Sequence, residues 1–190
     1  MGPLDQATLI SNEAELADTF GTPTSANAVD YHSAAYFLKY TNALQVVRVL
    51  GDSDGFNAYA HTEAANGLNV RIKDNDDWDN ALASFDSDQH TFIAKWPGEL
   101  GNSLRVSLCP QQGADSAYNN WTYKDNFDAA PGTSGYAEGV TATNDEVHVA
   151  IVDNGGKFSG TKGTILETFP FVSLASNAKT SDGSTNFVET

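Results

Sequence analysis

The strongest constraint on the fold is a pair of strand-like segments joined by a glycine-rich connection in the last third of the chain. Along EVHVAIVDNGG, Val147, Val149 and Ile151 alternate with His148, Ala150 and Val152. Successive side chains of a strand point to opposite faces, so this period of two is typical of a β-strand. A second such segment, TILETFPFVSLAS, contains Pro170, which indicates an edge strand or a bulge. We therefore predict a hairpin with a long connection.

A short helix near the N-terminus has clear start and stop signals. In SNEAELADTFG, Asn12 is a candidate N-cap and Glu15 follows three residues later, as in a capping box. Leu16 and Phe20 share one face, and Gly21 supplies a C-terminal stop. These signals predict a helix between Asn12 and Gly21.

An aromatic stripe predicts a second helix. The side chains that recur at helical spacing are Val29, Ser33, Tyr36, Phe37 and Tyr40. Such a stripe usually faces a core, and we interpret it so in preference to a binding groove. Asn42 is expected to end this helix, and residues 44–50 are predicted to form a mostly apolar strand buried on both faces.

The middle of the chain is less regular. Residues 51–67 are small, polar and rich in turn formers, which is typical of an excursion from a core. Residues 68–73 alternate like a short strand, and Trp78, Leu82 and Phe85 are spaced to form one face of a helix.

The turn between the strand-like runs TFIAKW and SLRVSLC is unusually well specified. Pro97 and Gly98 suit the central positions of a type II turn, because proline fixes φ and glycine accepts a positive φ. Gly101 and Asn102 form a second pair that tolerates left-handed conformations. We interpret the turn as a structural joint between two strands, with Leu100 tucked underneath as its plug.

Together these segments predict an α+β fold of mixed α/β character. Two N-terminal helices are expected to pack on a mixed sheet, with a smaller β-rich excursion and a C-terminal hairpin. We divide the chain into a helix–helix–strand part at residues 1–50, a short insertion at 51–90 and a β-rich part with long loops at 91–190.

The charge balance argues against two classes of partner. The chain of 190 residues has 25 acidic and 10 basic residues, for a net charge of −15. Nucleic acid and anionic membranes both require a basic face, so neither is expected as a partner. One cysteine allows no internal disulfide, and no apolar run approaches the length of a membrane span.

An acidic segment, DNDDWDN, has the carboxylate density of a calcium site. Its acids are Asp74, Asp76, Asp77 and Asp79. It fails as an EF-hand, because Trp78 occupies a ligand position and both the required glycine and the closing glutamate are missing. We interpret the segment as a solvated helix start, where the helix dipole favours negative charge; calcium binding is the alternative.

The sequence contains no convincing pattern for a catalytic nucleophile or for a metal site. Cys109 ends an apolar strand, where a buried, inert thiol is the default. The four histidines are His32, His61, His90 and His148, and their spacings are not those of a metal site. No G-x-S-x-G motif is present, and Glu99 is expected to be solvated or locally paired rather than a general acid. We therefore assign no catalytic, cofactor-binding or metal residue, and we predict that the chain is not an enzyme and needs no cofactor.

Two loops have compositions that could suggest a binding site. DNGGKFSGTKG is rich in glycine and lysine but has no G-K-[ST] that opens a helix, so it predicts a flexible hairpin tip rather than a phosphate loop. The aromatic residues of the other loop are Tyr118, Trp121, Tyr123 and Phe127. They are expected to pin that loop to the body of the protein, and an aromatic-lined sugar site is the alternative.

Three stretches resemble the tail sheath proteins of contractile-tailed bacteriophages of the T-even and cyanophage type. The first runs from GPLDQATLISNEAELADTFGTPT to DYHSAAYFLKYTNALQVVRVL, the second is WPGELGNSL, and the third is FSGTKGTILETFPFVSLASNAKTSDGSTNF. They occur in the order that the family has them and span about residues 2–187. Sheath proteins of this family are several times longer, with an extended arm before the first stretch and a large C-terminal region. The chain is therefore expected to be a fragment of such a protein.

The resemblance implies a structural subunit that stacks helically around a tail tube and contracts to drive it through a bacterial envelope. Its implied partners are other sheath subunits and the tube, and its implied location is the virion tail, after assembly in the host cytoplasm. The isolated chain is expected to be monomeric. Two alternatives stay open: the sheath of a related contractile injection or secretion machine, and an acidic carbohydrate-binding or hydrolytic module.

Overall fold

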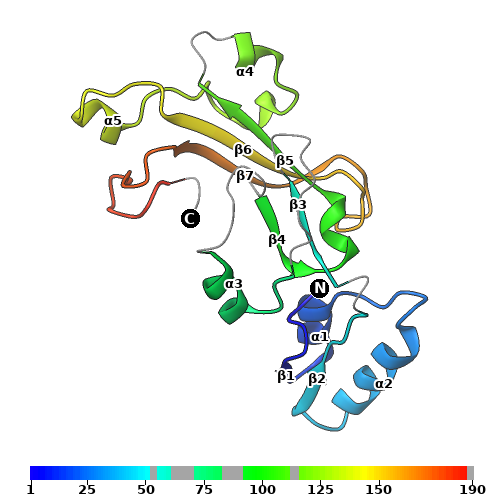
Figure 1. Cartoon of the computed structure of the whole chain (residues 1–190). Helices are drawn as coiled ribbons and strands as arrows, with labels where there is room; N and C mark the ends of the chain where they lie inside the picture. Colours follow the sequence, from blue (N-terminus) through cyan, green and yellow to red (C-terminus); the bar gives the residue numbers. More distant parts are fainter. Residues whose placement is uncertain (52–54, 61–70, 83–91, 112–115, 188–190) are drawn as a thin grey trace. The chain divides into compact units, whose positions relative to one another are not determined.

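The computed structural model describes residues 1–51, 55–60, 71–82, 92–111 and 116–187. The chain divides into two compact units, Met1–Asn102 and Ser103–Thr190 (Figure 1). The described elements are helices and small antiparallel sheets, so the predicted α+β class is confirmed, although the paired strands form no mixed sheet. The boundaries predicted at residues 50 and 90 do not coincide with this division, and the three-part organisation stays a prediction.

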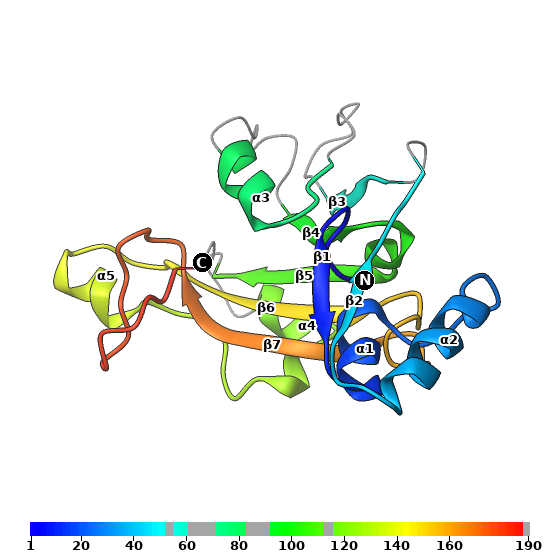
Figure 2. The same ribbon diagram turned by 90° about the horizontal axis from the view of Figure 1, so that it is seen from below.

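Unit 1 opens with a two-stranded ribbon and two helices. β1 (Ala7–Ile10) pairs antiparallel with β2 (Leu44–Val47). The connection between these strands contains α1 (Glu13–Phe20) and α2 (Ala28–Leu38), both of which lie beside the ribbon in Figures 1 and 2. β1 has no counterpart in the prediction from sequence. Residues 44–47 form a strand because they pair with β1.

The ribbon buries one face only. Because directly paired residues share a face, Ile10 and Leu44 point inward, whereas Leu9 and Val47 belong to the outer, exposed face. The prediction of a strand buried on both faces is therefore wrong. The prediction fails because no described element covers the outer face of the ribbon.

The aromatic stripe of α2 is also exposed. Val29 is 80 % exposed, Tyr36 64 %, Phe37 50 % and Tyr40 89 %, whereas Ala35 is the buried side chain of this helix. The interpretation of the stripe as core is wrong. The helix ends at Leu38, before the predicted stop at Asn42, and Ala35 rather than the stripe is its buried position.

The remainder of unit 1 contains a second ribbon and a helix. β3 (Asn57–Ala60) pairs antiparallel with β4 (Phe92–Pro97), and α3 spans Asn75–Leu82. Residues 68–70 of the predicted strand lie outside the described residues, and residues 71–73 are not in a strand. The expected helix around Trp78 is confirmed, but Phe85 lies outside the described residues.

A buried amide joins the parts of this second ribbon. The Asn57 side chain accepts a hydrogen bond from the Ile72 N–H at 2.7 Å and donates one to the Ala94 carbonyl at 2.8 Å. Asn57 is 3 % exposed, and Ile72 beside it is 2 % exposed. A buried amide with its hydrogen-bonding groups satisfied holds a segment in place without the desolvation penalty of an unpaired group.

Unit 2 is built on one antiparallel sheet in the order β5–β6–β7 (Figure 2). Its strands are β5 (Leu104–Pro110), β6 (Glu146–Asp153) and β7 (Thr164–Ser173). The predicted hairpin is confirmed, since β6 and β7 pair directly. The short helices α4 (Ser116–Asn120), η2 (Lys124–Asn126) and α5 (Gly135–Gly139) lie in the connection between β5 and β6.

The core of unit 2 lies between β6 and the connection that follows β5. Phe127, Ala150 and Val152 are buried together, and the side chains packed against them are Tyr118, Trp121, Tyr123 and Ile165. The central strand is buried along most of its length, which is the usual state of a strand with partners on both edges.

A bulge bends β7 at its proline, as the sequence predicts. Val147 pairs with Val172 and Val149 with Phe169, so Pro170 and Phe171 together oppose the single residue His148. Phe171 takes a positive φ of 54°. The fully buried His148 ring compensates for the missing ladder bond, because its Nδ1 accepts the Phe171 N–H at 3.0 Å.

Candidate functional site

The tip of the β6–β7 hairpin is organised around one carboxylate. Asp153, the last residue of β6, is fully buried and accepts hydrogen bonds from the backbone N–H groups of Lys157, Phe158 and Ser159 at 2.8–3.0 Å. The Ser103 hydroxyl donates to it at 2.6 Å. The tip that the sequence predicts to be flexible is thus a closed, hydrogen-bonded loop. An aspartate at a strand end, followed by two glycines and a serine, is the sequence signal for it.

The electrostatics of this loop follow from its donors. Burial alone would raise the pKa of Asp153, but hydrogen bonds from Ser103, Ser159 and Phe158 outweigh burial and hold its pKa well below the usual range. The carboxylate is therefore charged at neutral pH and acts as an acceptor only. Its role in the described structure is to close a turn, and no reacting group faces it.

A second network, around the half-buried Asp145, closes the opposite end of the sheet. The Asp145 carboxylate accepts hydrogen bonds from the Ser134 N–H at 2.8 Å and from the hydroxyls of Ser134 and Ser173. Burial opposes ionisation of Asp145, yet these bonds lower its pKa. The two serine hydroxyls are thus committed to the Asp145 carboxylate, which joins the loop before α5 to the end of β7.

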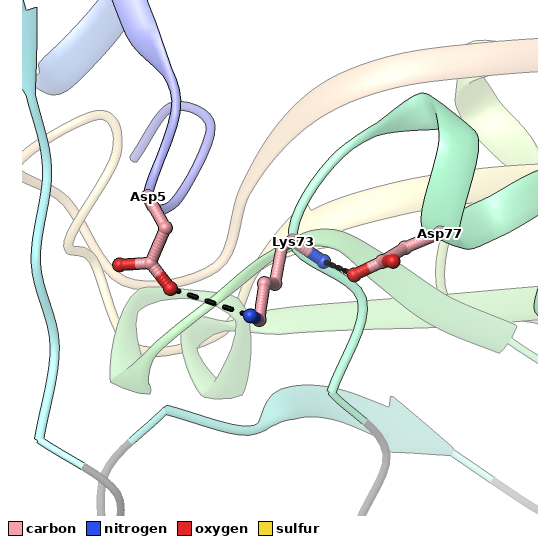
Figure 3. Close-up of polar contacts among 3 residues, drawn as sticks. All are labelled: Asp5, Lys73 and Asp77. Carbon is pink, nitrogen blue, oxygen red and sulfur yellow. Dashed lines mark hydrogen bonds and ion pairs between the residues drawn. The ribbon is translucent and has the colours of Figure 1, made fainter.

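The acidic segment at residues 74–79 starts α3, as predicted. Asp74 accepts the Asp77 N–H at 2.8 Å, and the Asp77 carboxylate accepts the Lys73 N–H at 3.1 Å (Figure 3). Lys73 also forms an ion pair with Asp5, its Nζ lying 3.4 Å from the carboxylate. Two of the four acids thus satisfy the helix N-terminus. Among the described residues no group of three or more potential ligands could hold a metal ion.

Cys109, the candidate nucleophile, and His148, the histidine paired with it, both make contacts that serve the structure. Cys109 is buried, and burial raises the pKa of its thiol, which disfavours the reactive thiolate. His148 pairs with Cys109 across β5 and β6, but its Nε2 donates to the Ala129 carbonyl at 2.8 Å and its Nδ1 accepts the Phe171 N–H. Both ring nitrogens are occupied, so this histidine cannot serve as a base for the thiol. His32 is exposed, and His61 and His90 lie outside the described residues.

The well-specified turn joins β4 to β5. Gly98 has a φ of +120°, which confirms the need for glycine there, and a 3-10 helix, η1 (Glu99–Ser103), follows it. Gly101 has an ordinary φ but a Cβ there would lie 2.8 Å from the Cβ atoms of Ala58 and Ala94. Its absent side chain therefore serves a close approach rather than a left-handed turn. Leu100 is half-buried and Glu99 is exposed, as expected.

The aromatic residues of the connection after β5 pack on their own sheet. The Trp121 Nε1 donates to the Ser107 hydroxyl at 2.9 Å, and Tyr118 donates to the carbonyls of Lys124 and Phe127. Phe127 stacks on the His148 ring with centroids 4.5 Å apart. These contacts confirm that the aromatic side chains pin the loop to its own sheet.

Comparison with known proteins finds two phage tail sheath proteins. The chain is 27 % identical to the tail sheath protein of Salmonella phage ViI over 153 residues, which is 80 % of the chain. It is 45 % identical over 49 residues to the tail sheath protein of Enterobacteria phage T4. The chain is similar to phage tail sheath proteins.

The similarity to tail sheath proteins covers a limited part of those proteins. The chain spans 21 % of the length of the phage ViI protein, and the shorter match covers 7 % of the T4 protein. No protein-family model matches the chain, and no solved structure does. None of the described helices is long and apolar enough to span a membrane.

Proposed function

We propose that this chain is part of the structural subunit of a phage contractile tail sheath. In this function the subunit assembles helically around the tail tube and contracts to drive the tube through the host envelope. The observation that carries the proposal is the similarity to two phage tail sheath proteins, one of which extends over 80 % of the chain.

The exposed apolar side chains of unit 1 support a role in assembly. On α2 they are Val29, Tyr36, Phe37 and Tyr40, and on the ribbon of β1 and the segment from Leu44 to Val49 they are Leu9, Val47 and Val49. A soluble monomer rarely leaves so many large apolar side chains exposed on so short a segment, and such surfaces mark sites of protein contact. A sheath subunit, which is surrounded by further sheath protein, provides such contacts.

The structural role also fits the chemistry of the polar groups. The buried acids, serines and histidine described above are satisfied by hydrogen bonds that close turns and strands, and none is placed as a nucleophile or base. We infer that the chain is not an enzyme and that contraction uses no cofactor. The energy is stored in a metastable extended sheath and released when subunits repack as near-rigid bodies.

The proposed partners are other sheath subunits and the tail tube, and the proposed location is the virion tail, after assembly in the host cytoplasm. The net charge of −15 disfavours nucleic acid and anionic membranes as partners. A related contractile injection machine would use the same subunit architecture, and the genes beside this one distinguish the two.

The test is to sequence the DNA that flanks the coding sequence and to label particles from the same source with an antibody raised against the chain. Sheath-like coding sequence, a neighbouring tail-tube gene and gold label along contractile tails are expected. Flanking genes for metabolic enzymes, together with unlabelled tails, would overturn the proposal.

A further inference from the structure

The β6–β7 tip, residues 154–163, begins with an asparagine that is followed directly by glycine, Asn154–Gly155. In such a pair the glycine nitrogen can attack the asparagine Cγ, because glycine has no Cβ to obstruct the approach. A bond forms between these two atoms, the bond from Cγ to the side-chain nitrogen breaks, and ammonia leaves with the proton of the glycine N–H. Water then opens the resulting succinimide at either carbonyl carbon, so the product is aspartate or isoaspartate.

The folded tip exposes the reactive side chain but restrains the attacking nitrogen. Asn154 is exposed to water, whereas the Gly155 N–H donates to the Ser103 carbonyl at 3.0 Å. Gly155 also lies so close to Ser103 that a Cβ there would be 2.4 Å from the serine Oγ. To react, the nitrogen must lose its proton and move toward the Asn154 Cγ. Both changes break its hydrogen bond to Ser103, which is only half-accessible to replacement by water at this buried serine.

Further hydrogen bonds fix the backbone on both sides of the pair. The Asn154 N–H donates to the Val152 carbonyl at 3.0 Å. The Gly156 N–H donates to the Asp153 carbonyl at 3.3 Å. The Ser103 hydroxyl, which donates to the Asp153 carboxylate at 2.6 Å, ties this turn to the residue before β5. Closure of a succinimide ring rotates the backbone within this turn, so the reaction requires a local opening of the tip.

We propose that Asn154 is a deamidation site that is silent while the tip is closed and reacts when the tip opens. Either product adds a carboxylate next to that of Asp153, where the like charges repel each other. Isoaspartate also lengthens the backbone by a methylene group, which displaces the Gly155 N–H from the Ser103 carbonyl. The tip then cannot close as before, so deamidation makes a transient opening permanent. The proposal is independent of the proposed sheath function.

Peptide mapping by mass spectrometry measures deamidation of Asn154 while the 190-residue chain is incubated in mildly alkaline buffer, folded or in concentrated urea. In urea, Asn66 of the other Asn–Gly pair is the internal standard for an unhindered reaction. The test variant, Ser103→Ala, removes the hydroxyl that binds Asp153. The matched control, Ser181→Ala, makes the same change at an exposed serine outside the tip. Hydrogen exchange of the Gly155 amide measures tip opening in the wild-type chain without any substitution.

In the folded wild type and in S181A, Asn154 is expected to react at least about tenfold more slowly than in urea, and S103A to react at least about threefold faster than S181A. The Gly155 amide of the wild type is expected to exchange slowly. Equal rates for folded and unfolded wild type, or a Gly155 amide that exchanges as fast as in an unstructured peptide, would overturn the proposal. So would a folded S103A that reacts no faster than S181A, or an Asn154 that stays intact in urea while Asn66 reacts.

Discussion

Asp153 illustrates how a single polar residue replaces a core beneath an exposed loop. Its carboxylate accepts three backbone N–H groups and two hydroxyls, which spares the loop backbone the cost of unpaired donors. Few apolar side chains are available at this tip to do the same by burial. The residue therefore determines whether residues 154–163 have one conformation.

Asp153→Asn should lower the urea midpoint of unfolding, because the amide has one acceptor oxygen and its NH₂ group would face N–H donors. The effect also has a pH signature. The folded pKa of Asp153 is depressed, so its stabilisation is complete above the unfolded pKa of about 3.9 and is lost as pH falls toward the folded pKa. The difference in stability between wild type and variant should therefore be constant at neutral pH and begin to shrink only as the pH falls below about 4. Urea titrations of both proteins, with the exposed Asp125→Asn as the control, measure this; equal midpoints at pH 7 would contradict it.

Gly98→Val should destabilise unit 1 by about 1–3 kcal/mol, because a β-branched residue is strained at a positive φ. A Cβ there would also lie 2.9 Å from Nη2 of Arg48, which donates to the Pro97 carbonyl. Glu99→Gln, next to it and exposed, is expected to be nearly silent. Chemical denaturation of the two variants compares them; a harmless glycine change, or a costly glutamate change, would show that the turn has been misread.

At the scale of elements, α1 and α3 begin in the same way. In each, the residue before the helix accepts the N–H of the third helical residue, from Asn12 to Glu15 and from Asp74 to Asp77. The acid at that third position then reaches back: Glu15 accepts the Ser11 N–H, as Asp77 accepts that of Lys73. The acidic density of residues 74–79 is thus explained in part by helix capping.

Millimolar calcium should leave the melting temperature of the chain nearly unchanged, because Asp74 and Asp77 are committed to the start of α3. A site with micromolar affinity would instead stabilise the fold by about 4 kcal/mol at a thousandfold excess over its dissociation constant. Thermal melts with calcium and with EDTA provide the comparison, and magnesium is the control. A calcium-specific rise of about 10 °C would refute the capping interpretation.

The bend of β7 depends on the imidazole of His148. The Ala129 carbonyl can only accept and the Phe171 N–H can only donate, so the ring carries its proton on Nε2. His148→Leu should cost about 1–3 kcal/mol for each partner left unsatisfied. Nitrogen-15 NMR of the wild-type ring is expected to show the neutral Nε2-protonated tautomer. The opposite tautomer, or a leucine variant as stable as wild type, would contradict this assignment.

At the scale of the whole molecule, charge opposes self-assembly. The net charge of −15 makes copies repel one another at low ionic strength. We expect a monomer at micromolar concentration and no tubes by negative-stain microscopy. Light scattering at increasing salt measures this, since screening exposes any intrinsic apolar contact. Ordered tubes formed by the chain alone would show that it needs no other segment to assemble.

Local signals predicted much of the fold. The caps of α1, the helix at residues 75–82, the hairpin of β6 and β7 and the bulge at Pro170 all follow from short-range chemistry that is legible in a few adjacent residues. The resemblance to tail sheath proteins could also be recognised from sequence, because its three stretches contain such turn and cap residues. The signals at these sites lie among sequence neighbours, so they can be read without knowledge of the remaining chain.

The sequence by itself determined the start of α1, the start of α3, the hairpin of β6 and β7, the positive φ of Gly98 and the similarity to phage tail sheath proteins. Only the tertiary structure decided which apolar faces are covered. The stripe on α2 has the periodicity of a core helix, yet it is exposed because no described element lies over it. Tertiary structure likewise brought Ser103 to Asp153 and Phe171 to His148, across separations of 50 and 23 residues. Periodicity records which residues share a face, whereas burial depends on what packs against that face.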